Sequence, residues 1–376
     1  MQSKTYTDLD VPERTLLGPG PSTVAPRVLR AMATPLLGHL DPQFLALMNE
    51  VQELLRYLFQ TENELTIPIS GTGSAGMEAA LCNFIEPGDR VLVAVMGYFG
   101  ERLVDIAGRY GAQVDRLDRP WGEVFDPSEI IAALQTKRYK LVAMVHAETS
   151  TGACQPGVAE IAEAAHRSGA LLVLDTVTSL GGLPVEIDRW GVDIAYSASQ
   201  KNLSAPPGLA PLTLSPRARQ ALSQRTTPVA NWYLDLTNLE KYWGKERTYH
   251  HTAPITMNYA LREALRMVAE EGLEARFARH RLNAALLWQG LEALDLPLLV
   301  PVEHRLPTLS TPLIPPGVDD AAVRRRLLDD YNIEIAGGFG PLKGKVWRIG
   351  LMGYSSRREN VTLLLSALGQ ILAEGI

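Results

Sequence analysis

The feature that most constrains the fold is a repeated alternation of short apolar runs with helical segments. The apolar runs have the length of buried strands and end in glycine, proline or small polar residues. The expected strands span 65–69, 90–95, 141–145, 171–174, 192–196 and 210–214, and the expected helices among them span 77–84, 101–110 and 159–167. Such alternation indicates a mostly parallel sheet. Ligands of these sheets lie beyond the carboxyl ends of the strands, so we expect functional residues directly after the strands.

Length and composition restrict the class of protein. The 376 residues are enough for two domains, and the net charge of −6 makes nucleic acid an unexpected partner. The two cysteines, Cys82 and Cys154, exclude a disulfide framework and a multi-cysteine zinc site. The start, Met1 to Tyr6, shows no apolar signal segment, and the last residues, 373–376, are not a peroxisomal address. No run reaches membrane-spanning length, so we expect a cytoplasmic protein without a membrane partner.

The organisation along the chain suggests an arm and two domains. Residues 1–25 are expected to form an extended N-terminal arm, because Gly18-Pro19-Gly20-Pro21 cannot continue a helix or a central strand. The large domain is expected over 26–257 and the small α+β domain over 258–376. The small domain is expected to contain helices over 259–270, 273–294, 319–331 and 357–372 and short strands near 308–313 and 345–350.

The functional argument depends on Lys201, which follows the expected strand 192–196 among small polar residues. Asp175 ends an earlier apolar run, where a carboxylate either caps a helix or has a chemical function. We interpret the segment between them as one crossover without a helix and one strand, so both groups would lie at the same edge of the sheet. A carboxylate beside a pyridine nitrogen keeps that nitrogen protonated. The pair therefore predicts a lysine that holds pyridoxal phosphate (PLP) as a Schiff base, with a solvated surface lysine as the alternative.

The segment Ser70-Gly71-Thr72-Gly73-Ser74-Ala75-Gly76 lies between a strand and a helix, where backbone N–H groups favour an anion. It matches the G-x-G-x-x-G pattern of dinucleotide sites. The next strand, however, ends without the acid that would hold a ribose. The segment therefore predicts a site for a single phosphate, with a structural tight turn as the alternative.

Three other segments carry candidate groups with two interpretations each. Phe99 either stacks on a flat ring or packs at a helix start, and the hydroxyls of 149–151 either donate to a ligand or cap the next helix. Arg348, in a strand-like run, binds either a substrate carboxylate or a structural acid. The adjacent His250 and His251 would face opposite ways on a strand, so we predict no metal site there.

These motifs together resemble the class V, fold-type I PLP aminotransferases, specifically the alanine–glyoxylate, serine–glyoxylate and serine–pyruvate group. The resemblance covers most of the chain, from Leu17 to Gly350. It implies a seven-stranded, mostly parallel sheet in the large domain, PLP as cofactor, and a homodimer whose active sites are shared at the interface. The segments that carry it are Ser70-Gly71-Thr72-Gly73, His146-Ala147-Glu148, Leu174-Asp175-Thr176-Val177, Ser199-Gln200-Lys201, Tyr249-His250-His251-Thr252 and Gly337-Gly338-Phe339-Gly340.

The resemblance also implies a role for each matching position. Lys201 would bind the cofactor and move the substrate proton, and Asp175 would pair with the pyridinium nitrogen; these are the expected catalytic residues. Arg348 would bind the substrate carboxylate, with Gly20 near the substrate. The remaining cofactor-binding residues are Val177 and Phe99 on the two faces of the ring, Thr72, Gly73, Ser74 and Gln200 at the phosphate, Thr149 near the ring oxygen, and Tyr249 and Thr252 reaching the cofactor of the partner subunit. Some relatives have tryptophan where Phe99 stands and histidine where Ser74 stands.

The implied reaction is transamination between alanine or serine and glyoxylate, which gives glycine and pyruvate or hydroxypyruvate. One alternative is a transaminase of the same group that acts on hydroxykynurenine or an aminophosphonate. Another is a PLP-fold protein that binds a ligand without turnover, which the presence of Lys201, Asp175 and Arg348 disfavours. A cysteine desulfurase needs a mobile cysteine late in the chain, where neither Cys82 nor Cys154 lies.

Overall fold

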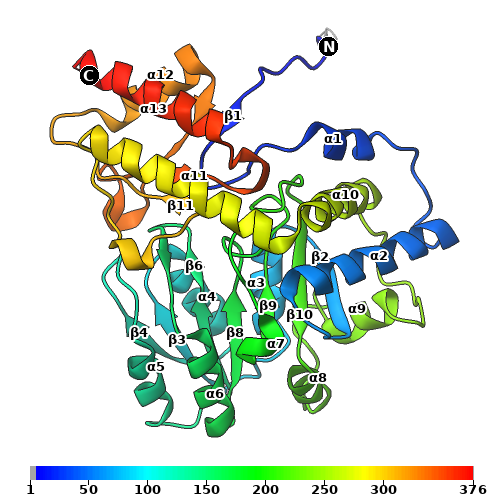
Figure 1. Cartoon of the computed structure of the whole chain (residues 1–376). Helices are drawn as coiled ribbons and strands as arrows, with labels where there is room; N and C mark the ends of the chain where they lie inside the picture. The colour runs from blue at the N-terminus through cyan, green and yellow to red at the C-terminus, as the bar shows by residue number, and fades with distance from the viewer. Residues whose placement is uncertain (1–5, 376) are drawn as a thin grey trace, which may run out of the picture.

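The computed structural model describes residues 6–375, and a seven-stranded sheet lies at its centre (Figure 1). The strand order is β2-β10-β9-β8-β5-β3-β4, in which β10 is antiparallel to both neighbours and every other pair is parallel. The sheet confirms the predicted fold class. Its strands are β2 (Leu65–Ser70), β3 (Arg90–Val95), β4 (Gln113–Asp118), β5 (Leu141–Val145), β8 (Leu171–Asp175), β9 (Ile194–Tyr196) and β10 (Leu209–Leu214).

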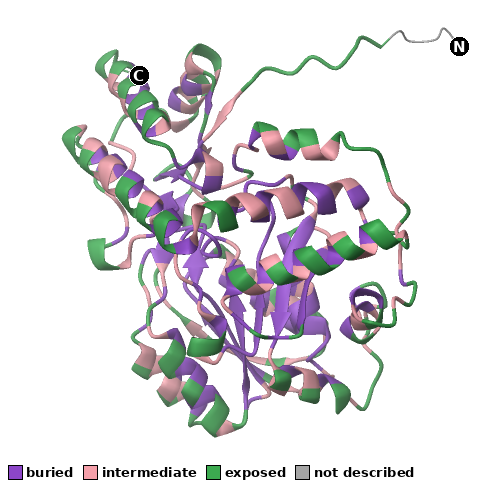
Figure 2. Ribbon diagram, turned by 45° about the vertical axis from the view of Figure 1, so that its right-hand side comes forward, coloured by how far each residue is buried: buried purple, intermediate pink, exposed green. Residues whose placement is uncertain are grey.

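Helices cover both faces of the sheet, which is why its inner strands are apolar throughout (Figure 2). Alternate residues of β3 enter different cores: Val91 and Val93 face α3 (Gly73–Cys82) and α4 (Tyr98–Arg109). Leu92 faces the other layer, which contains α5 (Pro127–Leu134) and α6 (Val158–Ser168). The short α7 (Ile187–Trp190) lies on the same side as α5 and α6. Helices α8 (Pro216–Ser223) and α9 (Leu236–Trp243) pack into the core on the side of α3 and α4.

The sequence pattern did not predict the edge strand β4 or the helices α5, α7, α8 and α9 of the sheet region. The edge strand β4 has only one neighbour, β3, and contains only two apolar residues, Val114 and Leu117, so no continuous apolar run marks it. The prediction of a crossover without a helix between Asp175 and Lys201 was wrong, because α7 lies there. Its four residues are too few to produce a helical pattern.

The N-terminal helices pack beside the sheet. Asp41 caps α2 (Pro42–Phe59) by accepting a hydrogen bond from the Gln43 N–H at 2.8 Å, and a proline follows at the first helical position. The buried stripe of this helix contains Phe44, Met48 and Val51. Helix α2 contacts α10 (Ile255–Glu271), which also packs on α1 (Pro26–Met32).

A separate core forms near the C-terminus, where α11 (Leu273–Ala293), α12 (Asp320–Tyr331) and α13 (Arg358–Ala373) surround small strands. The long helix α11 spans from the sheet layer to this core (Figure 1). The small strands are β11 (Leu309–Ser310), β14 (Trp347–Gly350) and β13 (Ala336–Gly337) in one sheet, and β1 (Thr15–Leu16) paired in parallel with β12 (Ile333–Glu334). Single 3-10 turns span Val302–His304, Gly340–Leu342 and Gly353–Ser355.

The predicted domain limits stay predictions. Part of the predicted arm, residues 1–5, and the last residue, 376, lie outside the described residues. The limit at 257 falls inside α10, and β1 of the predicted arm pairs with the C-terminal strand β12. None of the helices in the described part of the chain combines the length and apolar character that crossing a membrane requires.

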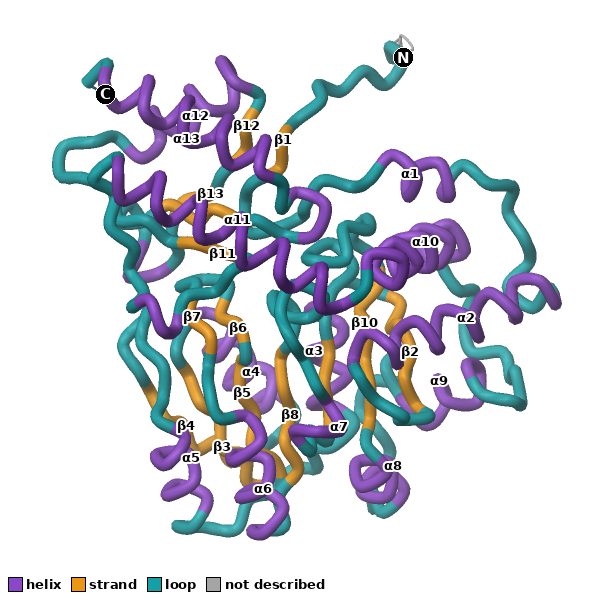
Figure 3. Tube along the Cα trace, viewed as in Figure 1, coloured by secondary structure: helices purple, strands orange, loops and turns teal. Residues whose placement is uncertain are grey.

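The loops at the carboxyl ends of the strands lie toward the C-terminal core (Figure 3). They carry a short hairpin of β6 (Ala147–Glu148) and β7 (Ala153–Cys154). Two hydrogen bonds join these loops to the C-terminal part: the Thr308 hydroxyl donates to the Thr178 carbonyl at 2.9 Å, and the Thr311 hydroxyl donates to the Thr151 carbonyl at 2.7 Å. The edge on which sequence analysis places the functional residues is therefore enclosed by the C-terminal core.

The central position of β10 predicts a large effect of truncating its core residues. Leu212 is fully buried between Ile67 of β2 and Tyr196 of β9. Leu212→Ala is expected to lower the free energy of unfolding by about 2–5 kcal/mol, because it removes buried methyl groups and leaves a cavity. The measurement is a urea unfolding curve. Leu363→Ala on α13, at a residue that is 42% exposed, is the control and should change that free energy by less than about 0.5 kcal/mol. Equal effects of the two variants would contradict the assignment of β10 to the core.

Candidate active site

Lys201 lies in the loop after β9, and its amine is enclosed. The Nζ donates a hydrogen bond to the Pro19 carbonyl of the N-terminal segment. A Cβ atom on Gly20, which has a φ of +111°, would lie 2.9 Å from that Nζ, so only glycine allows this approach. Burial, and to a smaller extent the nearby charge of Arg348, lower the pKa of Lys201 to about 8, although Asp175 opposes this shift. These properties contradict the alternative of a solvated surface lysine.

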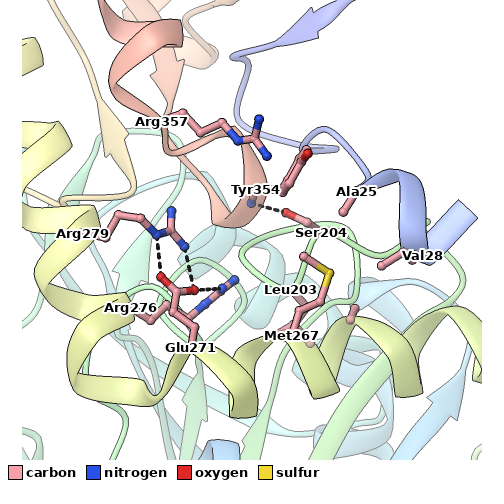
Figure 4. Close-up of a pocket in the computed structure, with 11 residues that line it drawn as sticks. Ala25, Val28, Leu203, Ser204, Met267, Glu271, Arg276, Arg279, Tyr354 and Arg357 are labelled. Carbon is pink, nitrogen blue, oxygen red and sulfur yellow. Dashed lines mark hydrogen bonds and ion pairs between the residues drawn. The ribbon is translucent and has the colours of Figure 1, made fainter.

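Hydrogen bonds from α11 and from the C-terminal part hold the loop that carries Lys201. Arg276 of α11 donates from Nη2 to the Asn202 carbonyl at 2.6 Å, and Glu271 pairs with both Arg276 and Arg279 (Figure 4). Ser204 Oγ accepts from the Tyr354 N–H at 2.8 Å, which ties the loop to the C-terminal part. These groups line a cavity of about 280 Å³. The buried guanidinium of Arg276 thus fixes the backbone next to Lys201.

Asp175 is the last residue of β8 and is buried. Its Oδ1 accepts the Val177 N–H at 2.8 Å, and its Oδ2 accepts the Tyr196 hydroxyl at 2.8 Å. Burial raises the pKa of Asp175 to about 6, although these donors and Lys201 oppose the shift. No helix starts at Asp175, which excludes the helix-cap interpretation. Sequence analysis missed Tyr196, whose position opposite Asp175 follows from the pairing of β8 with β9.

The glycine-rich segment forms the start of α3, with Thr72 at the N-cap position. The Thr72 side chain makes no capping hydrogen bond. A Cβ on Gly73 would lie 2.9 Å from the Ala198 Cβ, so the glycine allows close packing of the helix start on the loop before Lys201. Gln200 follows on that same loop, and its buried Oε1 has no hydrogen-bond partner among the described residues. The first N–H groups of this ten-residue helix have no partner within the helix, and such N–H groups suit an anion.

Arg102 of α4 is a site residue that sequence analysis missed. Its Nη1 donates to Ser74 Oγ at 3.0 Å, and its guanidinium lies 5.0 Å from the centre of the Phe99 ring. The only sequence signal was its position one turn after Phe99 on the same helix. Phe99 packs partly buried against the sheet core, as does Val177.

Thr149, Ser150 and Thr151 form the buried turn between β6 and β7. The Thr149 hydroxyl is hydrogen-bonded to the Thr178 hydroxyl. The alternative that these residues cap the next helix was wrong, because Gly157 occupies the N-cap position of α6. Three residues separate the hairpin from this helix, too far for the hydroxyls to reach its first turn.

Arg348 of β14 is buried. Its Nε donates to the Gly337 carbonyl at 2.8 Å, and its guanidinium carbon lies 3.8 Å from the centre of the Phe339 ring. Burial lowers the pKa of Arg348 to about 10. Within residues 6–375 no carboxylate lies at ion-pair distance from it, which contradicts the structural salt bridge. Phe339 is a further neighbour that sequence reasoning gave no role.

Tyr249 and Thr252 stand apart from this cluster and are exposed. The segment that carries them contacts the glycine-rich loop through His251, whose Nε2 lies 2.7 Å from Ser70 Oγ. The expectation of opposed histidines on a strand was wrong, because this segment is in no strand and the two Nδ1 atoms of His250 and His251 lie 2.8 Å apart. Stacking of His250 on Trp232, with ring centres 4.5 Å apart, turns its ring toward His251. The roles predicted for all these residues stay predictions.

Comparisons with known proteins place the chain in a family. Residues 16–362 match the family model "Aminotransferase class-V". A curated relative, the (S)-ureidoglycine–glyoxylate transaminase of Bacillus subtilis, is 45% identical over 97% of this chain and 92% of its own length. The alanine–glyoxylate aminotransferase of Drosophila melanogaster is 42% identical over 97% of this chain and 93% of its own length.

Solved structures agree with this result. A crystal structure of an alanine–glyoxylate aminotransferase from Nostoc sp. superimposes with a TM-score of 0.97 at 58% identity and covers 98% of both chains. An aspartate aminotransferase from Thermus thermophilus gives a TM-score of 0.86 at 36% identity, covering 95% of this chain and 99% of its own. These matches confirm the resemblance and the fold-type I architecture. The chain therefore belongs to the class-V aminotransferase family and is an aminotransferase that depends on pyridoxal 5′-phosphate.

Proposed function

We propose that this protein transfers the amino group of alanine or serine to glyoxylate, giving pyruvate or hydroxypyruvate and glycine. The observation that carries the proposal is a buried Arg348 without an acidic partner among the described residues, within electrostatic range of the enclosed amine of Lys201. A free guanidinium suits a carboxylate, which every proposed substrate has. Relatives named for glyoxylate aminotransfer, at 42% to 58% identity, support the choice of acceptor.

The residues present fit the cofactor of the family. Lys201 offers an enclosed amine with a lowered pKa, and Asp175 offers a buried carboxylate that a pyridinium would satisfy. The start of α3, with Thr72, Gly73 and Ser74, offers N–H and hydroxyl donors for a phosphate, and Gln200 on the neighbouring loop offers its side-chain NH2 group. When bound, PLP supplies an aldehyde for the lysine and a ring that accepts the electron pair released at the substrate Cα.

Each residue of the site has a distinct proposed task. Arg348 anchors the substrate carboxylate, and Lys201, whose lowered pKa of about 8 makes the neutral amine accessible near physiological pH, takes the proton from the substrate Cα and returns it. Asp175 stays ionised beside a positive ring nitrogen, because an opposite charge lowers the pKa of a buried carboxylate. The remaining cofactor contacts are proposed for Phe99 and Val177 on the ring faces, for Thr149 at the ring oxygen, and for Gly20 next to the substrate.

A second candidate amino donor is (S)-ureidoglycine, which the similarity to a relative named for this donor favours. The Bacillus subtilis relative named for this donor is 45% identical in sequence, and its solved structure superimposes with a TM-score of 0.96. Alanine, serine and ureidoglycine all carry a carboxylate next to the amino group, so contacts with Arg348 do not distinguish them.

We further propose a homodimer in the cytoplasm in which Tyr249 and Thr252 of each subunit reach the cofactor of the other. Trp232 is 64% exposed and Tyr249 is 59% exposed, a large aromatic surface for a monomer. This surface adjoins the glycine-rich loop through the contact of His251 with Ser70. Two free cysteines, Cys82 and Cys154, agree with a reducing compartment.

The function and the role of Arg348 have a joint test. Wild-type protein with PLP is expected to form glycine from glyoxylate with alanine or serine, measured by chromatography of the products. Arg348→Ala should raise the KM for the donor by about 10- to 100-fold, because charge-assisted hydrogen bonds to the carboxylate are lost. Arg348→Lys should recover only part of this loss, since an ammonium cannot make the bidentate pair. If glycine formed with neither alanine nor serine, the proposed reaction would be refuted. If glycine formed with ureidoglycine alone, the alternative would be established.

The lowered pKa of Lys201 predicts a pH dependence of cofactor uptake. Only the neutral amine attacks an aldehyde, so below pH 8 each pH unit should lower the rate of PLP incorporation into the apoprotein about tenfold, and above pH 8 the rate should level off. Stopped-flow absorbance of the bound cofactor measures this rate. Butylamine, whose amine has an ordinary pKa, is the control and should continue to gain rate to about pH 10.4. If the rate for the protein also rose up to about pH 10.4, the lowered pKa of Lys201 would be contradicted. Lys201→Ala should not incorporate PLP at any pH.

A shared active site predicts complementation between two inactive variants. Lys201→Ala and Tyr249→Ala subunits, unfolded together at equal amounts and refolded, should form hybrid dimers in which one site has both native residues. About a quarter of all sites are then native if subunits pair at random. Activity assays before and after mixing measure the recovery. No gain on mixing, with hybrid dimers demonstrated by mass spectrometry, would show that Tyr249 serves its own subunit.

A further inference from the structure

Glu148 is a buried acid to which the proposed mechanism gives no task. It ends β6 and is fully inaccessible to solvent. Its Oε1 accepts the N–H of Ser150 at 3.0 Å and the hydroxyl of Ser150 at 2.6 Å. Its Oε2 accepts the N–H of Phe99 at 3.3 Å, and the N–H of Gly100 also donates to the carboxylate. The described residues place no cation at ion-pair distance, so backbone and hydroxyl donors alone satisfy this acid.

Two of these donors belong to the first turn of α4. The first N–H groups of a helix lack partners within the helix, and a side chain at the N-cap position usually supplies one. Here the N-cap residue is Gly97, which has no side chain to do so. Glu148, which lies far along the chain from α4, takes that place and puts a negative charge at the positive end of the helix dipole.

The glycine at position 97 is explained by this arrangement. Gly97 has a φ of 171°, an extended conformation that any residue adopts. A Cβ atom at this position, however, would lie 2.4 Å from Cγ and 2.5 Å from Cδ of Glu148. Position 97 is therefore restricted by space and not by backbone conformation. Gly97 and Glu148 form one unit, in which the absent side chain makes room for the acid that caps the helix.

The first two turns of α4 carry two groups that face the proposed cofactor site. Phe99 donates its own N–H to Glu148, so the acid fixes the backbone from which the ring extends. Arg102 follows one turn later, contacts the Phe99 ring and reaches Ser74 at the start of α3. We infer that Glu148 is a positioning residue that caps α4 from outside the helix and thereby holds Phe99 and Arg102 in place over the cofactor. The inference rests on the proposed cofactor site and not on the choice of amino donor.

The test compares three variants of the full-length protein. Glu148→Ala removes the cap, and Glu148→Gln keeps the shape but offers only one acceptor oxygen. The double variant Gly97→Asp/Glu148→Ala restores a cap from the ordinary N-cap position, since the extended backbone permits aspartate and the space of Glu148 is vacated. The Ser150 Oγ lies 2.5 Å from the new Cβ position and also accepts the Tyr98 N–H at 3.0 Å, so in the double variant it has to rotate away from that N–H.

The readouts are the dissociation constant for PLP, the visible circular dichroism of bound PLP, and the kcat and KM of any amino donor. Glu148→Ala is expected to weaken PLP binding by about 2- to 30-fold, the factor that corresponds to loss of a helix cap, and to reduce the dichroism because the ring of Phe99 is no longer fixed. The kcat should fall while the KM of the donor changes little, because Arg348 is untouched. Glu148→Gln should be intermediate, and the double variant should recover both the affinity and the dichroism.

A matched control separates positioning from general destabilisation. Asp126 caps α5, remote from the site, by accepting the Ser128 N–H at 2.8 Å. Asp126→Ala should lower the melting temperature with no change in PLP binding or dichroism. Unchanged PLP binding and dichroism in Glu148→Ala would overturn the inference, as would failure of the double variant to recover them when its melting temperature matches that of wild type. A wild-type protein that binds PLP but makes no glycine would refute the proposed reaction alone, since these readouts need no glyoxylate.

Discussion

The structure of the site depends on the pairing of β8 with β9, because this pairing satisfies the buried carboxylate of Asp175. An acid at the buried end of a central strand is unfavourable without donors. The register places Tyr196 directly opposite Asp175, and its hydroxyl supplies one hydrogen bond while the turn after β8 supplies the Val177 N–H. The same strand β9 then leads to Lys201. A single parallel pairing thus positions the acid, its donor and the lysine loop together.

Around this pair lie ionisable side chains whose charges are not balanced by an opposite charge at ion-pair distance among the described residues. Lys201 is drawn toward neutrality by burial and by Arg348, whereas Asp175 and Glu148 have raised pKa values because burial disfavours their charged forms. Arg348 is supported by a carbonyl and an aromatic ring and by no acid in the described part of the chain. A positive ring nitrogen would satisfy Asp175, and the carboxylate of a substrate would satisfy Arg348. Perturbed groups that converge in this way are typical of catalytic sites.

Sequence patterns predicted the parts of this arrangement that are local. Apolar runs marked the inner strands because both faces of each are buried, and the residues that follow those strands contained Asp175, Lys201 and the glycine-rich segment. The pattern failed where burial is only partial, as in β4, or where an element is too short to show a period, as in α7. It also left two interpretations open for Asp175 and Arg348, which contacts with other elements decided.

The sequence by itself determined the fold class, the family and the positions from which the functional groups extend, because strand length, burial and strand-end residues are encoded within short windows. Only the tertiary structure decided which distant groups meet: Tyr196 with Asp175, Arg102 with Ser74, Pro19 and Gly20 with Lys201, and Glu148 with the start of α4. The physical reason is that a hydrogen bond between remote segments depends on strand register and helix placement. These follow from packing of the whole chain and leave no periodic signal in any single segment.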